Sequence, residues 1–284
     1  MKSHGARLEA WALMSPALAL LGTISAVPML YVVWLSLGQR AMFRPPGFAG
    51  LDHYLRIATD ERFWNALGNT LYFAAFSVAL ELALGLGIAL LLQRAGRARA
   101  LVYGAVLVPW AIPSVVSARM WEWMYHPEIG VLSYLLGQPV NWLGEPGLAL
   151  HAAIAMDVWK STPFVALLLL AGLQAIPRDL ARAAAVDGAG AWTVFRRITL
   201  PLLAPVILVA AVFRTIDALR VFDAIYVLTG GGPANSTETL SIYAYRVLFQ
   251  MLDFGYGSAL AVVMLAITGI AALAYARLLR AQTG

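Results

Sequence analysis

Ionisable side chains inside long apolar runs are the residues of this sequence whose chemistry stands out. Arg214, Asp217, Arg220 and Asp223 alternate in sign at a spacing of three within the run 202–228. Charged groups are costly in a bilayer and usually face a protein interior or a water-filled path. Neighbours three apart on a helix can neutralise each other in part. The four residues therefore predict either contacts that lock helices together or groups that line a transport route.

A second polar cluster combines Asp157, Trp159 and Lys160. Hydrogen-bonding groups beside an aromatic face suit the recognition of a sugar, whereas an Asp157–Lys160 pair at i, i+3 also suits a purely structural ion pair. Glu81 stands alone in another apolar run and needs a cation from elsewhere in the fold. The candidates are Arg214 and Lys160.

Signals for catalysis or metal binding are missing from the sequence. It contains no cysteine and no G-x-x-x-x-G-K-[ST] phosphate loop, and the glycines at 230–232 lack the lysine that such a loop requires. The four histidines show no metal-ligand spacing. His151 and Ser258 lack the surrounding motif of a serine enzyme. We therefore expect a protein that is not an enzyme and that binds no cofactor or metal itself.

Composition indicates a polytopic membrane protein. Of the 284 residues, 61% are hydrophobic and only 12% are charged. The first apolar run is 28 residues long, which exceeds the apolar region of a signal peptide (roughly 7–15 residues) and suffices to cross a bilayer. Each span must be helical to satisfy its backbone hydrogen bonds. We predict an all-α fold with six transmembrane helices, at 10–37, 71–92, 101–117, 148–173, 202–228 and 255–276.

The distribution of basic residues predicts the orientation in the membrane. Positive residues collect on the cytoplasmic side, so the net charge of +5 indicates topology rather than nucleic-acid binding. If the N-terminus is inside, eleven basic residues are cytoplasmic: Lys2, Arg7, Arg94, Arg97, Arg99, Arg178, Arg182, Arg196, Arg197, Arg277 and Arg280. Six lie outside: Arg40, Arg44, Arg56, Arg62, Arg119 and Arg246. Both termini are therefore expected in the cytoplasm.

A basic segment between the fourth and fifth spans, which we call the inner loop (residues 178–201), would then face the cytoplasm. Its alanines at 183–185 favour helix, and Asp187-Gly188 interrupts it. A second helical pattern, ended by Pro201, places three apolar residues on one face: Trp192, Phe195 and Ile198. Two short helices at a glycine turn form a compact knob suited to a cleft on another protein.

The spacing of the inner loop resembles the cytoplasmic "EAA" loop of importer-type ABC permeases, E-A-A-x3-G-x9-I-x-L-P. Asp187 precedes the glycine as is usual there, and Arg182 replaces the glutamate. Six positions match in register: Ala183, Ala184, Gly188, Ile198, Leu200 and Pro201. Residues 157–180 and 221–249 also resemble the sugar-type permeases of the maltose and glycerol-phosphate group.

This resemblance implies a type I ABC importer permease fold, with residues 67–280 as the transmembrane domain and 1–66 preceding it. It implies import of a sugar, of di- or oligosaccharide size, by alternating access across a bacterial or archaeal cytoplasmic membrane. The implied partners are a second homologous permease, two ATP-binding subunits that hold ATP and Mg, and a periplasmic or lipid-anchored solute-binding protein. The alternative is an ion-coupled secondary transporter that uses the intramembrane charges as a relay.

Overall fold

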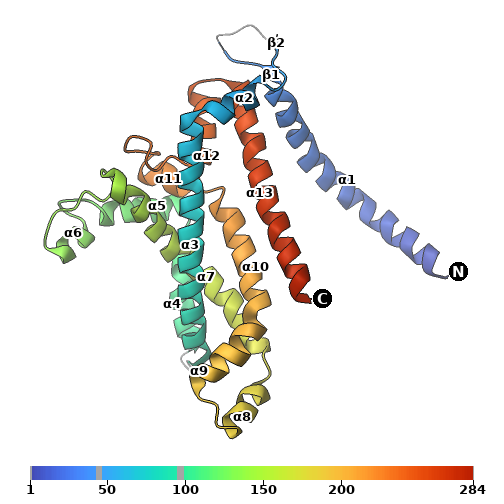
Figure 1. The fold of residues 1–284 in the computed structure, drawn as a ribbon, viewed down its shortest axis with the longest axis vertical. Helices are drawn as coiled ribbons and strands as arrows, with labels where there is room; N and C mark the ends of the chain where they lie inside the picture. The colour runs from blue at the N-terminus through green and yellow to red at the C-terminus, as the bar shows by residue number, and fades with distance from the viewer. Residues whose placement is uncertain (1, 43–46, 95–98, 284) are drawn as a thin grey trace. The chain divides into compact units, whose positions relative to one another are not determined.

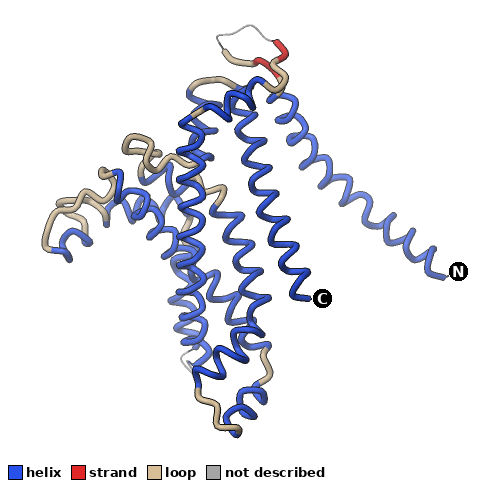
Figure 2. The backbone as a smooth tube through the Cα atoms, viewed as in Figure 1, coloured by secondary structure: helices blue, strands red, loops and turns tan. Residues whose placement is uncertain are grey.

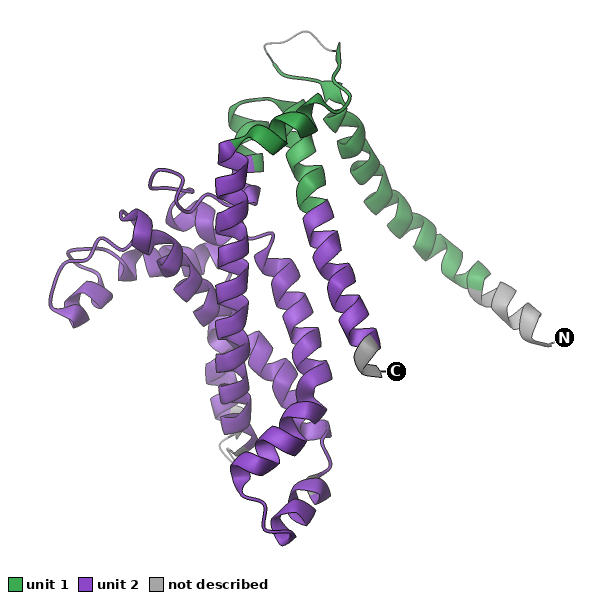
Figure 3. Cartoon of the chain, in the orientation of Figure 1, with its two compact units in different colours: residues 1–60, 244–265 green, residues 61–243, 266–284 purple. Residues whose placement is uncertain are grey.

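The structure is a computed structural model that describes residues 2–42, 47–94 and 99–283. Helices make up most of the described chain (Figures 1 and 2). The chain divides into two compact units, residues 1–60 with 244–265, and residues 61–243 with 266–284 (Figure 3). The predicted boundary at residue 66 remains a prediction.

Long apolar helices confirm the predicted membrane class. Within the described residues, five helices are long and apolar enough to cross a membrane, or six if one bent pair counts as a single span. The five are Trp11–Ser36, Glu61–Gln93, Pro146–Ala175, Ala191–Ala218 and Phe254–Arg280, and the bent pair joins Leu101–Ala111 to Ser114–Met124.

The first unit contains α1 (Lys2–Ser36), the antiparallel two-residue strands β1 (Gly38–Gln39) and β2 (Gly47–Phe48), and α2 (Asp52–Thr59). It also holds the π-helical turn η3 (Arg246–Gln250) and the beginning of α13 (Phe254–Thr283). Arg56 ties α2 to the start of α13: its guanidinium pairs with Asp253 at 3.2 Å and lies over the ring of Tyr256. α12 (Leu240–Tyr245) runs across the unit boundary.

The second unit is built on α3 (Glu61–Arg94), α7 (Pro146–Ala175) and α10 (Leu200–Ala218). α3 packs along α7, and α10 contacts both. Gly172 permits the close approach of α7 and α10, because a Cβ there would lie 2.8 Å from the side chain of Leu203. Leu169, Leu170 and Leu203 are fully buried at this contact.

The third span is not the single helix predicted at 101–117. It consists of α4 (Arg99–Ala111) and α5 (Ser114–Met124), which meet at 92°. Pro113 is the physical reason, because proline has no N–H to donate and disfavours a helical residue before it. A short helix, α6 (Val131–Leu136), follows before α7.

The fifth span also ends earlier than predicted. α10 ends at Ala218, and a separate short helix, α11 (Asp223–Leu228), follows. Between them Phe222 adopts φ −133° and ψ −63°, outside the helical region, and the Val221 carbonyl accepts a hydrogen bond from Thr239 rather than from a helical N–H. The alternating charges therefore do not form one continuous helical ladder.

Candidate functional site

The inner loop begins with α8 (Arg178–Val186), as its alanines predict. The helix closes with hydrogen bonds from Gly188 N to Ala185 O (3.1 Å) and from Ala189 N to Ala184 O (2.9 Å). This pattern is a Schellman turn, which needs a left-handed residue after the helix. Gly188 supplies it with φ +79°, so the predicted glycine turn is confirmed.

The second helical segment continues further than the sequence predicted. α9 (Ala191–Val194) passes through a π-helical turn, η2 (Phe195–Thr199), directly into α10. The expectation that Pro201 ends this segment is wrong. Leu200 donates its N–H to Phe195 O, five residues back, and this wider turn accommodates the proline without breaking the helix.

The surface of the inner loop combines charge with exposed apolar side chains. Trp192 is 70% exposed although its ring stacks on Phe195, and Val186 is 88% exposed. Arg182, where the EAA pattern has glutamate, pairs with Asp179 at 3.2 Å. Exposed apolar groups on a polar knob are typical of a contact surface.

A cluster of ion pairs lies between the three central helices. Arg214 on α10 donates two hydrogen bonds to Glu81 on α3, at 2.5 and 2.9 Å, and one to Asp157 on α7 at 3.0 Å. It also pairs with Asp217 on its own helix. Glu81 has no exposed surface, and the Arg214 side chain is 6% exposed. Of the two cations considered for Glu81, the structure selects Arg214.

Lys160 does not pair with Asp157. Its Nζ donates instead to the backbone carbonyls of Trp110 (3.4 Å) and Ile112 (2.6 Å). These carbonyls lie where α4 ends, and terminal carbonyls of a helix need partners from outside it. Lys160 therefore joins α7 to the bend of the third span, a role that its spacing from Asp157 did not reveal.

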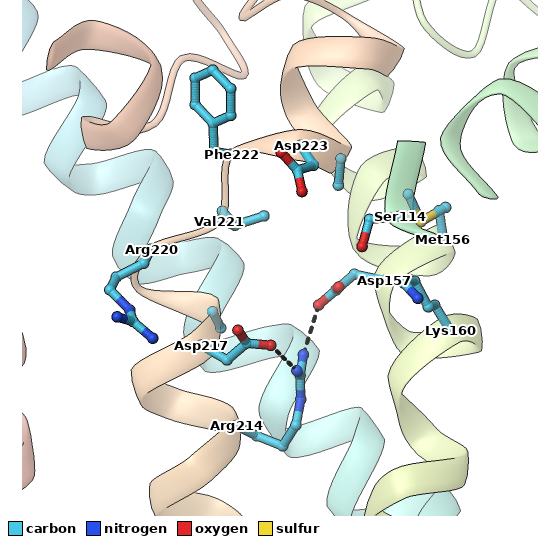
Figure 4. A pocket seen from close by; sticks show the side chains of 12 residues that line it. Ser114, Met156, Asp157, Lys160, Arg214, Asp217, Arg220, Val221, Phe222 and Asp223 are labelled. Atoms are coloured by element: carbon cyan, nitrogen blue, oxygen red, sulfur yellow. Dashed lines mark hydrogen bonds and ion pairs between the residues drawn. The ribbon is translucent and has the colours of Figure 1, made fainter. Parts of the chain in front are cut away.

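A polar pocket of about 150 Å³ opens beside this cluster (Figure 4). Six of the predicted site residues line it: Asp157, Lys160, Arg214, Asp217, Arg220 and Asp223. Glu81 and Trp159 are not among its described lining residues. Glu81 lies behind Arg214, and the Trp159 ring meets Trp121 edge to face at 5.6 Å.

The pocket has walls that sequence reasoning missed. Ser114 belongs to the bent third span, and Val221 and Phe222 lie in the break between α10 and α11. Arg220 donates to the Ile216 carbonyl at 3.2 Å. The proline at 113 was the available signal for Ser114, whereas the break near Phe222 has no local signal. Among the described residues, no His, Cys, Asp and Glu group is arranged to hold a metal ion.

The inner loop and the pocket are connected by one helix. Helical structure is continuous from Ala191 to Ala218, 28 residues, with Trp192 near one end and Asp217 near the other. At 1.5 Å per residue the helix is about 42 Å long. The inner loop and the wall of the pocket are therefore parts of one helical segment.

Comparison with known proteins places these features in a family. The description "Binding-protein-dependent transport system inner membrane component" matches residues 81–283. The trehalose/maltose transport system permease protein MalF of Thermococcus litoralis is 46% identical over 252 residues, covering 87% of this chain and 85% of the relative. The trehalose transport system permease protein SugA of Mycobacterium tuberculosis is 41% identical over 274 residues, covering 96% and 89%.

Solved structures agree in fold. A bacterial ABC transporter involved in the import of the acidic polysaccharide alginate matches with a TM-score of 0.84 at 25% identity, covering 100% of this chain and 99% of that chain. The MetNI methionine ABC transporter matches with a TM-score of 0.59 at 19% identity, over 77% of this chain and 95% of that chain. At that identity the second likeness concerns the fold alone.

Proposed function

The chain belongs to the family of binding-protein-dependent transport system inner membrane components, and we propose that it is the permease subunit of an ABC importer that carries a neutral di- or oligosaccharide into the cell. Two relatives that match most of its length are a trehalose/maltose and a trehalose transport system permease protein. These relatives favour ATP-driven import over the ion-coupled alternative. The buried charges then serve packing and the transport route rather than an ion relay.

The observation that carries the proposal is the continuous helix from Ala191 to Ala218. One end presents Trp192 to a partner, and the other end holds Arg214 and Asp217 in the wall of the pocket. Work done on the inner loop can therefore reach the pocket along one continuous helical segment. Alternating access follows if this helix tilts and the pocket wall moves with it.

The charges of the pocket favour a neutral sugar. Its described lining contains three cationic residues, Lys160, Arg214 and Arg220, and three acidic ones, Asp157, Asp217 and Asp223. Arg214 is neutralised further by Glu81. An acidic sugar would need an excess of cations, whereas hydroxyl groups can donate to carboxylates and accept from guanidinium and ammonium groups.

The proposed assembly has four further components. A second, similar permease completes the transmembrane part, two ATP-binding subunits hold ATP and Mg at the inner loops, and an external solute-binding protein delivers the sugar. Hydrolysis takes place in the ATP-binding subunits. In this proposal both termini lie in the cytoplasm, as the distribution of basic residues predicts. Two of the arginines counted in that distribution, Arg44 and Arg97, lie outside the described residues.

Reconstitution of the assembled complex in proteoliposomes tests this function. With the binding protein present, trehalose or maltose should stimulate ATP hydrolysis and be taken up, and an acidic disaccharide of the same size should do neither. Uptake driven by an ion gradient without ATP, or equal uptake of the acidic disaccharide, would contradict the proposal.

A further inference from the structure

The charged residues that line the polar pocket differ in the partners they already have. Arg214 donates to the carboxylates of Glu81 on α3 and Asp157 on α7, and it pairs with Asp217 on its own helix. Lys160 donates to two backbone carbonyls where α4 ends. These five residues therefore join α3, α7, α10 and the end of α4, and their hydrogen bonds are directed at the protein itself.

Arg220 and Asp223 line the same pocket, and both are exposed. The Arg220 side chain makes one hydrogen bond to a described residue, from Nε to the Ile216 carbonyl four residues back at 3.2 Å, and no ion pair. No hydrogen bond or ion pair joins the Asp223 carboxylate to any described residue. A guanidinium has five N–H donors and a carboxylate about four acceptor sites, so both groups can still bind a ligand.

The break between α10 and α11 separates these two groups. On a continuous helix, residues three apart are neighbours, and opposite charges there attract each other. Phe222 lies outside the helical region at φ −133°, and within the described part of the chain Arg220 and Asp223 form no ion pair. Figure 4 shows their side chains on opposite sides of Val221. A ligand in the pocket can therefore meet a donor on one side and an acceptor on the other.

The pocket has the size and the lining of a site for one sugar ring. Its volume of about 150 Å³ is roughly half the lower limit of ~300 Å³ for pockets that enclose a whole small-molecule ligand. Val221 and Phe222, which lie between Arg220 and Asp223 in the sequence, contribute apolar surface to the lining. A sugar ring presents hydroxyl groups at its edge and C–H groups on its faces, and each kind of surface has a counterpart here.

We propose that Arg220 and Asp223 bind hydroxyl groups of one ring of the transported sugar. Arg220 donates to hydroxyl oxygens, Asp223 accepts from hydroxyl groups, and Val221 and Phe222 contact the C–H groups of the ring. Asp223 also sets the selectivity of the pocket, because its unpaired carboxylate repels an acidic sugar. The inference rests on the proposed function for the identity of the ligand as a sugar.

Binding of sugar to the purified assembled complex, measured without ATP and without the solute-binding protein, tests this assignment. Saturation-transfer NMR titrations, which detect weak binding, compare maltose with a disaccharide of glucose and glucuronic acid. Arg119→Met is the matched control, because Arg119 is 62% exposed and its ion pair with Glu122 lies outside the described lining of the pocket. The thermal unfolding midpoint is measured for every variant.

The variants should separate sugar binding from stability. Arg220→Met should weaken maltose binding by roughly ten-fold, because a charged donor to the sugar is lost. Its unfolding midpoint should stay close to that of the wild type, since the one described hydrogen bond it loses lies within its own turn. Asp223→Asn leaves three cationic and two acidic residues in the described lining and should strengthen binding of the acidic disaccharide by roughly ten-fold. Arg119→Met should bind both sugars as the wild type does.

Three binding results would each overturn the inference: no maltose binding by the wild-type complex, wild-type maltose binding by Arg220→Met, or no gain of acidic-disaccharide binding by Asp223→Asn. A large fall in the unfolding midpoint of Arg220→Met would also overturn it, because it would assign Arg220 to the residues that join helices. The outcome is separate from that of the proposed function. ATP-driven uptake of maltose can succeed while both variants bind as the wild type does, and binding can depend on Arg220 while uptake fails.

Discussion

Replacement of Arg214 by methionine removes the cation that contacts carboxylates from three helices. Glu81, which has no exposed surface, then loses two hydrogen bonds of 2.5 and 2.9 Å, and Asp157 loses one of 3.0 Å. Removing one partner of a buried ion pair destabilises a protein by about 3–5 kcal/mol, because the remaining charge is uncompensated. At about 2–4 °C per kcal/mol, the unfolding midpoint should fall by roughly 6–20 °C.

The double variant Glu81→Met with Arg214→Met shows whether the destabilisation comes from leaving Glu81 without its cation or simply from losing the arginine side chain. It removes both buried charges and keeps apolar volume, a change that is often neutral or stabilising. Asp157 and Asp217 remain, but their side chains are 13% and 67% exposed, so water or Lys160 can compensate them. We expect the double variant to be more stable than Arg214→Met by at least about 1 kcal/mol.

Thermal unfolding of the purified complex, followed by intrinsic fluorescence, measures both variants. Arg119→Met is the matched control, because Arg119 is 62% exposed in an i, i+3 pair with Glu122. Such a pair contributes at most about 0.5 kcal/mol. The reasoning is refuted if Arg214→Met lowers the midpoint no more than Arg119→Met, or if the double variant is less stable than the single one.

Three further changes test other contacts. Gly188→Leu places a side chain on a residue with φ +79°, at a cost of roughly 1–2 kcal/mol, and should lower the amount of sugar moved per ATP hydrolysed. Gly188→Asn, which tolerates this conformation better, should retain more of that coupling. Wild-type coupling in the Leu variant would contradict this prediction. Gly172→Val should destabilise the folded protein by about 1–3 kcal/mol, because the Cβ of the valine would lie 2.8 Å from the Leu203 side chain. The measurement is the thermal unfolding midpoint, which should fall. An unchanged midpoint would show that α7 and α10 can move apart without cost. Arg62→Gln removes two 2.7 Å hydrogen bonds to the buried Glu238, which hold the loop 229–239 against α3. Limited proteolysis within this loop should therefore be faster in the variant. An unaltered cleavage rate would show that Arg62 does not hold the loop in place.

Local signals were sufficient for much of the fold. Apolar runs of bilayer length predicted the spans, because a backbone in hydrocarbon has little choice but helix. Gly188 was predictable for a similar reason, since a left-handed residue after a helix is usually glycine. Pro201 misled the sequence argument: a proline signals a helix end, but the π-helical turn at Phe195 removed the conflict.

The site itself depended on packing. The i, i+3 spacing of Arg214 and Asp217 predicted their ion pair correctly. The same spacing suggested an ion pair between Lys160 and Asp157, but Lys160 instead donates to a backbone carbonyl at the bend beside Pro113. The choice of Arg214 for Glu81 required knowing which faces of α3 and α10 meet.

The existence of apolar spans, the glycine turn and the family pattern of the inner loop were thus readable from neighbouring residues alone, because each reflects a constraint on a few consecutive residues. Which charges meet, where α4 and α10 end, and that one helix runs from Trp192 to Asp217 were settled by the packed chain. Partners of a buried charge come from helices more than fifty residues apart, and no local pattern specifies their relative rotation.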